Sequence, residues 1–137
     1  MILIIPGQPI AKKRHRFSTR GGYVQTYDCQ GKEKKEFQMK LLIEKNKLGY
    51  YFDDDDVFSL NIIFAIEAPK SLSKREKERR LYMGSHTQKP DLDNALKFVL
   101  DCGNKILWED DCKIFEINAL KVWSEKPYTQ ITINKFK

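Results

Sequence analysis

The feature that most constrains this fold is a nearly continuous apolar run from Val57 to Ile66, VFSLNIIFAI. A strand with one face in solvent alternates apolar and polar residues, whereas a continuous apolar run is typical of a strand buried on both faces. Such a strand lies inside a sheet and has neighbours on both edges. We therefore expect this run to be a central, covered strand.

Shorter patterns on either side of this run predict the rest of one domain. Strands are expected at 1–6, 23–27, 112–123 and 128–136, and helices at 31–48 and from 91 to about 107. The apolar side of the second helix is expected to hold Leu92, Leu96, Val99, Leu100 and Gly103. Residues 70–88 are expected to form a surface loop or a short helical excursion. With no internal repeat or domain boundary, residues 1–137 predict a single compact α+β domain with a mixed sheet packed against helices.

The charge balance favours a polyanionic partner. Lys and Arg number 25 and Asp and Glu 19, which gives a net charge of +6. Basic side chains that neutralise phosphates release counterions from a nucleic acid, so a positive chain is suited to binding one. Composition alone does not choose between DNA, RNA and a merely soluble surface.

Cysteine usage and hydropathy predict a cytoplasmic protein. The three cysteines are odd in number and form no CxxC pair, which argues against a disulfide framework or a thiolate zinc site. No apolar run approaches the roughly 18 residues of a membrane span. The start MILIIPG has neither the basic residues nor the length of a signal peptide. Neither export nor a membrane partner is expected.

The stretch KPDLDNALK, residues 89–97, places two carboxylates at the start of the second predicted helix. Pro90 disfavours helix at the residue before it, so the helix is expected to begin near Asp91. Asp93 then lies in the first turn, and Lys97 lies one turn further on the same face. The spacing clusters Asp91, Asp93 and Lys97 at the solvent-facing start of a packed helix.

A second acidic pair, Asp110 and Asp111, lies between this helix and the next strand. Magnesium takes one or two carboxylates plus substrate phosphate, and two such ions can stabilise the attacking and leaving oxygens of a phosphodiester. A helix that ran to Leu107 would keep this pair far from Asp91. If residues 103–108 fold back instead, the acidic turn approaches the helix start.

The acidic and basic features also have readings without chemistry. Asp91 could be a plain N-cap, with Asp93 favouring the helix dipole and pairing with Lys97, and spacing alone slightly favours this reading. The basic cluster at 12–16 is denser than solubility requires, although such runs are usually solvated.

Three further features are expected to carry no chemistry. The acidic run at 53–56 is predicted to be a solvated turn without a basic partner. His15 and His86 lie in no metal-ligand or triad pattern, and are expected to face DNA or to have no particular role.

The stretch KPDLDNALKFVLDCGNKILWEDDCKI, residues 89–114, resembles the signature of the RusA family of Holliday junction resolvases. In that family a KPDxDN segment is followed by a lysine, an LD pair and, later, a DD next to a strand. The stretch PGQPIAKKRHRFSTRGGYVQTY, residues 6–27, is similar to the family's proline-rich and arginine-rich N-terminal segment. Residues 31–67 match the family only in the general type of sequence. The sequence CGNK at 102–105 stands where the family commonly has a turn of the Ala-Leu-Asn-Gly type.

The resemblance implies a homodimeric, magnesium-dependent endonuclease, often of phages and prophages, that resolves four-way DNA junctions by paired nicks. Manganese could serve in place of magnesium. Carried over to this chain, the catalytic residues are Asp91, Asp93, Lys97 and Asp111, and the three aspartates are the metal ligands. Asp110 is the less certain member of its pair, and Asp101 matches a family position but is read as structural.

A basic set is expected to contact DNA phosphates, and its members are Lys12, Lys13, Arg14, Arg16, Arg20 and Lys89. The expected process is DNA recombination and repair. Two other readings remain open, a nuclease of the same chemistry on flaps or other branched DNA and a nucleic-acid-binding module without catalysis. Dependence on a divalent ion separates the binding module from a nuclease, and a panel of labelled substrates separates junctions from flaps.

Overall fold

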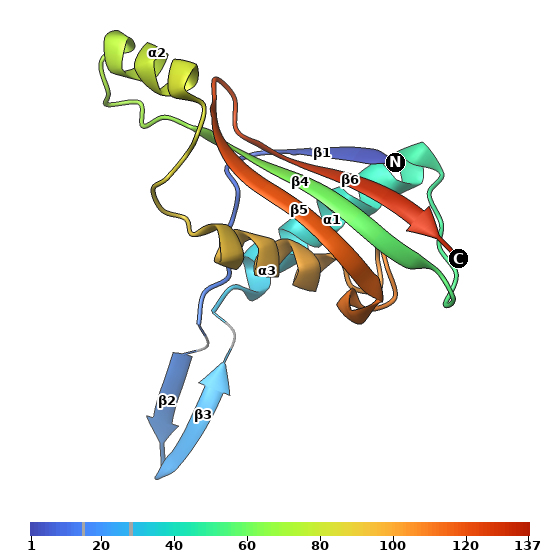
Figure 1. The fold of residues 1–137 in the computed structure, drawn as a ribbon. Helices are drawn as coiled ribbons and strands as arrows, with labels where there is room; N and C mark the ends of the chain where they lie inside the picture. Colours follow the sequence, from blue (N-terminus) through green and yellow to red (C-terminus); the bar gives the residue numbers. More distant parts are fainter. Residues whose placement is uncertain (15, 28) are drawn as a thin grey trace.

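The computed structural model describes residues 1–14, 16–27 and 29–137. At residues 16, 20 and 25–27 it describes the backbone only. The elements follow one another along the chain as shown in Figure 1. They are β1 (Ile2–Pro6), β2 (Arg16–Arg20), β3 (Tyr23–Tyr27), α1 (Gly31–Leu48), β4 (Val57–Glu67), α2 (Lys74–Met83), α3 (Leu92–Gly103), the short 3-10 helix η1 (Asp111–Lys113), β5 (Ile114–Ser124) and β6 (Tyr128–Phe136).

Four strands form one mixed sheet in the order β1-β6-β4-β5, which confirms the predicted α+β architecture. β5 runs parallel to β4, while β6 is antiparallel to both β4 and β1. The apolar run of the sequence is β4, with a neighbouring strand on each edge. Strands β2 and β3 pair with each other in a separate hairpin that projects from the body of the molecule (Figure 1).

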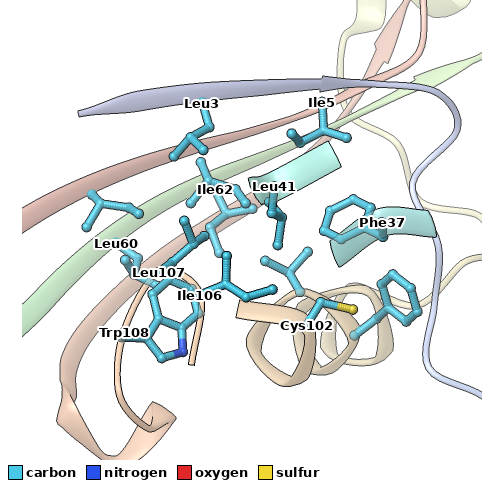
Figure 2. Close-up of a cluster of buried hydrophobic side chains, with 14 of the residues drawn as sticks. Leu3, Ile5, Phe37, Leu41, Leu60, Ile62, Cys102, Ile106, Leu107 and Trp108 are labelled. Carbon is cyan, nitrogen blue, oxygen red and sulfur yellow. The ribbon is translucent and has the colours of Figure 1, made fainter. Parts of the chain in front are cut away.

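Helices α1 and α3 pack on one face of this sheet, and the hydrophobic core lies between them and the strands (Figure 2). On β4, every second side chain from Phe58 to Phe64 is buried in this core. The opposite face carries exposed side chains such as Ile4, Asn61 and Leu120. β4 is therefore central, as predicted, but the helices of the described chain cover it from one side only.

α1 joins the sheet to α3 through two apolar side chains, Phe37 and Leu41, which are buried in the core. The Phe37 ring meets the Phe98 ring of α3 edge to face, with 5.4 Å between the ring centroids. Gly49 ends α1 with a positive φ of 62°, a conformation that glycine adopts without steric cost. This packing fixes the position of α3 against the sheet.

α3 ends at Gly103, earlier than the predicted end near Leu107. The amides of Ile106 and Leu107 both donate to the Gly103 carbonyl, so the chain turns tightly after the helix. The indole ring of the fully buried Trp108 packs directly beside Gly103, and a Cβ built on this glycine would lie 2.3 Å from it. Only glycine therefore allows the helix to end against this tryptophan.

The buried side of α3 is rotated slightly from the predicted one. Its buried residues are Ala95, Phe98, Val99, Cys102 and Gly103. Leu96 and Leu100 pack at the margin of the core, and Leu92 is exposed. The opposite side of the helix presents Asp93, Lys97 and Asp101, each four residues from the next.

The acidic turn at 53–56 differs from the prediction. Asp56 is 1% exposed, and its Oδ2 accepts a hydrogen bond from the Asp53 amide at 2.7 Å and lies 3.5 Å from Lys135 Nζ. The Asp53 carboxylate pairs with Lys137 at 3.1 Å. The prediction of a solvated turn without a basic partner is wrong, because both partners come from the distant C-terminal end of the chain.

The charged segment at 70–88 contains α2, the helical excursion that was one of the two expectations for it. Ser73 caps this helix, since its Oγ accepts from the Glu76 amide at 3.2 Å. None of the residues of α2 is buried. Over the described ranges, no helix is both long and apolar enough to cross a membrane.

Candidate active site

The N-terminus of α3 holds the first candidate carboxylate, Asp91. It is at the N-cap position with extended backbone, yet its side chain makes no cap hydrogen bond. Lys89 Nζ donates instead to both carboxylate oxygens of Asp91, at 2.7 and 2.9 Å. This hydrogen-bonded cation lowers the pKa of Asp91, which keeps the carboxylate ionised at neutral pH. The N-cap reading thus explains the position of Asp91 but not the orientation of its carboxylate.

Asp93 and Lys97 lie one turn apart on the solvent side of α3, as the spacing predicts. Lys97 Nζ is 3.7 Å from Asp93 Oδ2. The Lys97 side chain is 60% exposed and the Asp93 side chain 69% exposed. An ion pair this exposed contributes little to stability, because water screens it. Both groups can therefore exchange this contact for one with a ligand.

The turn that leads into α3 is fixed by a lysine that sequence reasoning missed. Lys121 Nζ, on β5, donates to the carbonyls of Gln88 and Pro90 at 2.7 and 2.6 Å. These bonds anchor the backbone that carries Lys89 and Asp91. A lysine inside a strand gives no signal of such a contact, because backbone acceptors are not marked in a sequence.

Lys12 lies along α3 and contacts it near both ends. Its amide donates to the Asn94 carbonyl at 2.9 Å, and its Nζ pairs with Asp101 Oδ2 at 2.5 Å. The buried Gln30 side chain holds this segment in place. Its Oε1 accepts from the Lys13 amide at 2.6 Å, and its Nε2 donates to the Ala11 carbonyl at 2.8 Å. Lys12 is therefore a fixed cation at the centre of the site.

Two grooves adjoin at Lys12 and Lys13. The first has a volume of about 610 Å³ and is lined by Lys12, Lys13, Arg14, Asp91, Asp93, Asn94 and Lys97. The second has a volume of about 460 Å³, shares the two lysines and extends to Lys34 and Asp101. The first groove thus combines two carboxylates with four cations, an arrangement that can hold a metal ion and a phosphate together.

Asp110 and Asp111 follow the other end of α3 and have different surroundings. Asp110 Oδ1 accepts from the Cys112 amide at 2.9 Å and caps η1, and this backbone hydrogen bond lowers the pKa of Asp110. Partial burial raises the pKa of Asp111, and the Asp110 and Asp101 carboxylates raise it further, against the opposing charge of Lys12. Asp111 therefore belongs to a charge cluster with Asp101 and Lys12, while Asp110 has a structural partner.

The chain is similar to known proteins over most of its length. The family model described as endodeoxyribonuclease RusA matches residues 6–134 of the chain. The chain belongs to the RusA family. The crossover junction endodeoxyribonuclease rusA of Lactococcus phage r1t is 28% identical to it over 115 residues, 83% of this chain and 80% of the phage protein. The uncharacterized protein YqaN of Bacillus subtilis (strain 168) is 30% identical over 133 residues, 94% of this chain and 92% of the relative.

The predicted RusA resemblance is confirmed, and with it the enzyme class, an endodeoxyribonuclease. In this RusA-family enzyme Asp91, Asp93 and Lys97 share the first groove, whereas Asp111 does not line it. Over residues 1–14, 16–27 and 29–137, no three His, Cys, Asp or Glu side chains are gathered closely enough to hold a metal ion. The groove itself offers two carboxylates, the number that magnesium commonly takes from a protein.

The basic residues expected to contact DNA are placed in three ways in this RusA-family enzyme. Lys12, Lys13 and Arg14 line the first groove. Lys89 is paired with Asp91. Arg16 and Arg20 are the ends of β2, in the hairpin, where the backbone alone is described.

Of the two histidines, only His86 can be placed, and it does not line the groove. His15 lies outside the described residues. His86 is buried, 5% exposed, with its ring 4.3 Å from the Trp123 ring between centroids. Of the two expectations for His86, contact with DNA is wrong, because the end of β5 covers the ring, and the expectation of no particular role in the chemistry remains.

Proposed function

We propose that this RusA-family enzyme is a magnesium-dependent endonuclease that resolves four-way DNA junctions by paired nicks. The observation that carries the proposal is the groove in which Asp91, Asp93 and Lys97 lie beside the basic segment at 12–14. The family supplies the reaction, hydrolysis of a phosphodiester bond in DNA. The name of the phage relative supplies the substrate, a crossover junction.

The basic segment is proposed to draw the DNA backbone towards the acids. Lys13 and Arg14 are exposed, and Lys13 is engaged only weakly, with its Nζ 3.3 Å from the exposed Glu33 carboxylate. Cations in such positions can neutralise phosphates and release counterions. The segment would therefore hold a DNA strand in the groove, above Asp91 and Asp93.

Asp91 and Asp93 are proposed to hold a magnesium ion together with an oxygen of the scissile phosphate. When bound, the ion would stabilise charge that develops on the phosphate as water displaces the leaving oxygen. The Lys89 side chain is 85% exposed. Lys89 could therefore leave Asp91 when the ion binds and contact a DNA phosphate instead. Contact with a phosphate is what the sequence predicts for Lys89.

Asp111 is proposed as the third carboxylate in preference to Asp110; among the described residues it is not gathered with Asp91 and Asp93, so it must approach them when the ion binds. The Asp110 carboxylate is engaged at the start of η1, where it accepts from a backbone amide. Desolvation and the carboxylates of Asp110 and Asp101 raise the pKa of Asp111, so a cation near Asp111 would offset the repulsion from these two carboxylates. Lys97, beside Asp93, is proposed to position the attacking water or to offset charge on the leaving oxygen.

Two nicks at symmetric positions require two active sites, and a homodimer supplies them with the two-fold symmetry of the junction. We therefore propose that the enzyme acts as a homodimer. The substrate is the second part of the proposal. We propose four-way junctions, and the alternative is a nuclease of the same chemistry that acts on flaps.

The proposed substrate is tested with end-labelled four-way junction, flap and plain duplex DNA of equal length, each incubated with the enzyme and Mg²⁺. We expect paired nicks in the junction and little cutting of the other two. Manganese should replace magnesium, and a chelator should stop cutting. Preferential cutting of the flap would contradict junction resolution and leave the nuclease chemistry intact.

A further inference from the structure

Helix α2 and the short turn before it carry most of the chain's excess positive charge, although they lie outside the groove. Residues 70–83 contain six Lys or Arg residues and two Glu, a net charge of +4 out of +6 for the whole chain. None of the residues of α2 is buried, so the helix contributes nothing to the hydrophobic core. Its charged side chains are therefore accessible to a partner.

One side of α2 is fixed to the end of β5. The Arg80 guanidinium lies 4.6 Å from the centroid of the Trp123 ring, and the side chain is only 14% exposed. Lys77, Arg80 and Leu81 line a small cavity of about 170 Å³ together with Trp123. Glu76 accepts from Arg80 Nε at 3.2 Å, which holds the guanidinium in place. The helix is thus anchored and its other side has a defined direction.

That other side is a cationic and aromatic face. Arg75, Glu78, Arg79 and Tyr82 recur at helical spacing, with Lys74 beside them. The Tyr82 side chain is 96% exposed, although an aromatic ring is normally at least partly covered. Lys74 and Arg75 form no ion pair within the described residues, whereas Arg79 donates to both carboxylate oxygens of Glu76, at 2.9 and 2.7 Å, with its side chain 62% exposed. We define this outer face as Lys74, Arg75, Glu78, Arg79 and Tyr82.

The position of α2 relative to the groove is fixed by the segment that joins it to α3. The Gly84 carbonyl accepts from the Trp123 amide at 2.8 Å, and the His86 amide donates to the Lys121 carbonyl at 3.2 Å, so this segment lies along the edge of β5. In Figure 1 the start of α3 lies between α2 and the β2–β3 hairpin. DNA that enters the groove would pass one of these projections on each side.

We infer that the outer face of α2 binds the phosphate backbone of a duplex arm of the DNA substrate. This inference rests on the proposed function, since it places α2 on DNA whose scissile strand lies in the groove. Lys74, Arg75 and Arg79 contact phosphates, and Tyr82 packs against the backbone sugars or donates its hydroxyl to a phosphate. Glu78, on the same face, opposes this binding.

The test is binding of a fluorescent four-way junction in chelator, measured by anisotropy over a range of salt concentrations. The variant Lys74→Ala/Arg75→Ala/Arg79→Ala removes three charges from α2. The matched control Lys35→Ala/Lys40→Ala/Lys47→Ala removes three charges from α1. Both variants should fold, because alanine favours helix and none of these side chains is buried.

The α2 variant should bind roughly tenfold more weakly than the control, and its slope of log affinity against log salt should fall by about 0.9 for each phosphate that the variant no longer neutralises. Glu78→Gln should strengthen binding, a result that damage to the fold cannot produce. Shortening the junction arms should remove the difference between the α2 variant and the control.

Equal affinities and equal salt slopes for the two triple variants would overturn the inference. The proposed function fails separately, if the unaltered enzyme with Mg²⁺ does not nick the junction. An α2 variant that binds junctions as the control does, in an enzyme that nicks them, rejects the α2 contact alone.

Discussion

At the scale of single residues, the site shows how neighbouring identical side chains acquire different properties. Asp110 and Asp111 are adjacent, but Asp110 accepts a backbone hydrogen bond, whereas desolvation and the negative charges of Asp110 and Asp101 act on Asp111. The pKa of Asp110 is lowered and that of Asp111 is raised. The two should therefore affect stability in opposite directions.

Asp111→Asn should raise the melting temperature at pH 7, and Asp110→Asn should lower it. A raised pKa in the folded state means that ionised Asp111 destabilises the fold, and this penalty grows as pH rises above the ordinary carboxyl pKa of 3.8. A lowered pKa means that ionised Asp110 stabilises the fold, and this contribution is lost as pH falls below 3.8 through its folded pKa.

The measurement is thermal unfolding of both variants and the unaltered chain at pH 7 and in acid. Both differences should shrink towards zero in acid. A lower melting temperature for Asp111→Asn at pH 7 would show that Asp111 has a stabilising partner instead of a repulsive one.

At the scale of elements, the turn after α3 determines where the second acidic pair lies. Gly103 is the last residue of the helix, and Trp108 occupies the space that a side chain there would need. The Trp108 indole also donates to Asn104 Oδ1 at 2.9 Å. This local packing sets the path of the chain into η1.

Gly103→Ala should reduce the free energy of unfolding by roughly 1–3 kcal/mol, because the added methyl overlaps the Trp108 ring and the core must shift to accept it. The control is Gly31→Ala, where a Cβ meets no atom within 4 Å. That variant should be as stable as the unaltered chain or more stable by up to about 1 kcal/mol. Urea unfolding measures both, and equal stabilities would contradict the role given to Trp108.

The elements that sequence reasoning predicted well are those set by local pattern. The apolar run of β4 and the start of α3 after Pro90 are both where the sequence places them. The helical pattern missed the end of α3, because that end depends on the contact between Gly103 and Trp108, although the alternative in which residues 103–108 turn out of the helix is present. Asp56 was misread for a similar reason, since its partner Lys135 comes from the far end of the chain.

In the candidate site too, the contacts set by local spacing could be predicted and those set by packing between elements could not. The pairing of Asp93 with Lys97 follows from spacing along one helix, and it is present. The contacts of Lys12 with Asp101 and of Lys121 with the turn before α3 depend on how separate elements pack. Sequence spacing carries no information about them.

At the scale of the whole molecule, the enzyme is a single domain from which two projections extend, the β2–β3 hairpin and α2 (Figure 1). The start of α3, whose residues help to line the groove, lies between them in this view. Paired nicking predicts that two copies act together, so the mass in solution should be twice the chain mass of 16.2 kDa. Light scattering of the free enzyme and of its junction complex measures this, and a single-chain mass in both would contradict the dimer.

The decisive experiment compares nicking of a labelled four-way junction by the unaltered enzyme, Asp93→Asn and the control Asp55→Asn, with Mg²⁺ and with chelator. Asp93 lies in the groove, whereas Asp55 is exposed in the turn before β4. Asp93→Asn should lose roughly a hundredfold or more of the Mg²⁺-dependent rate while binding the junction as before, and Asp55→Asn should cut normally. Normal Mg²⁺-dependent cutting by Asp93→Asn would show that the groove at the start of α3 is not the centre of cleavage.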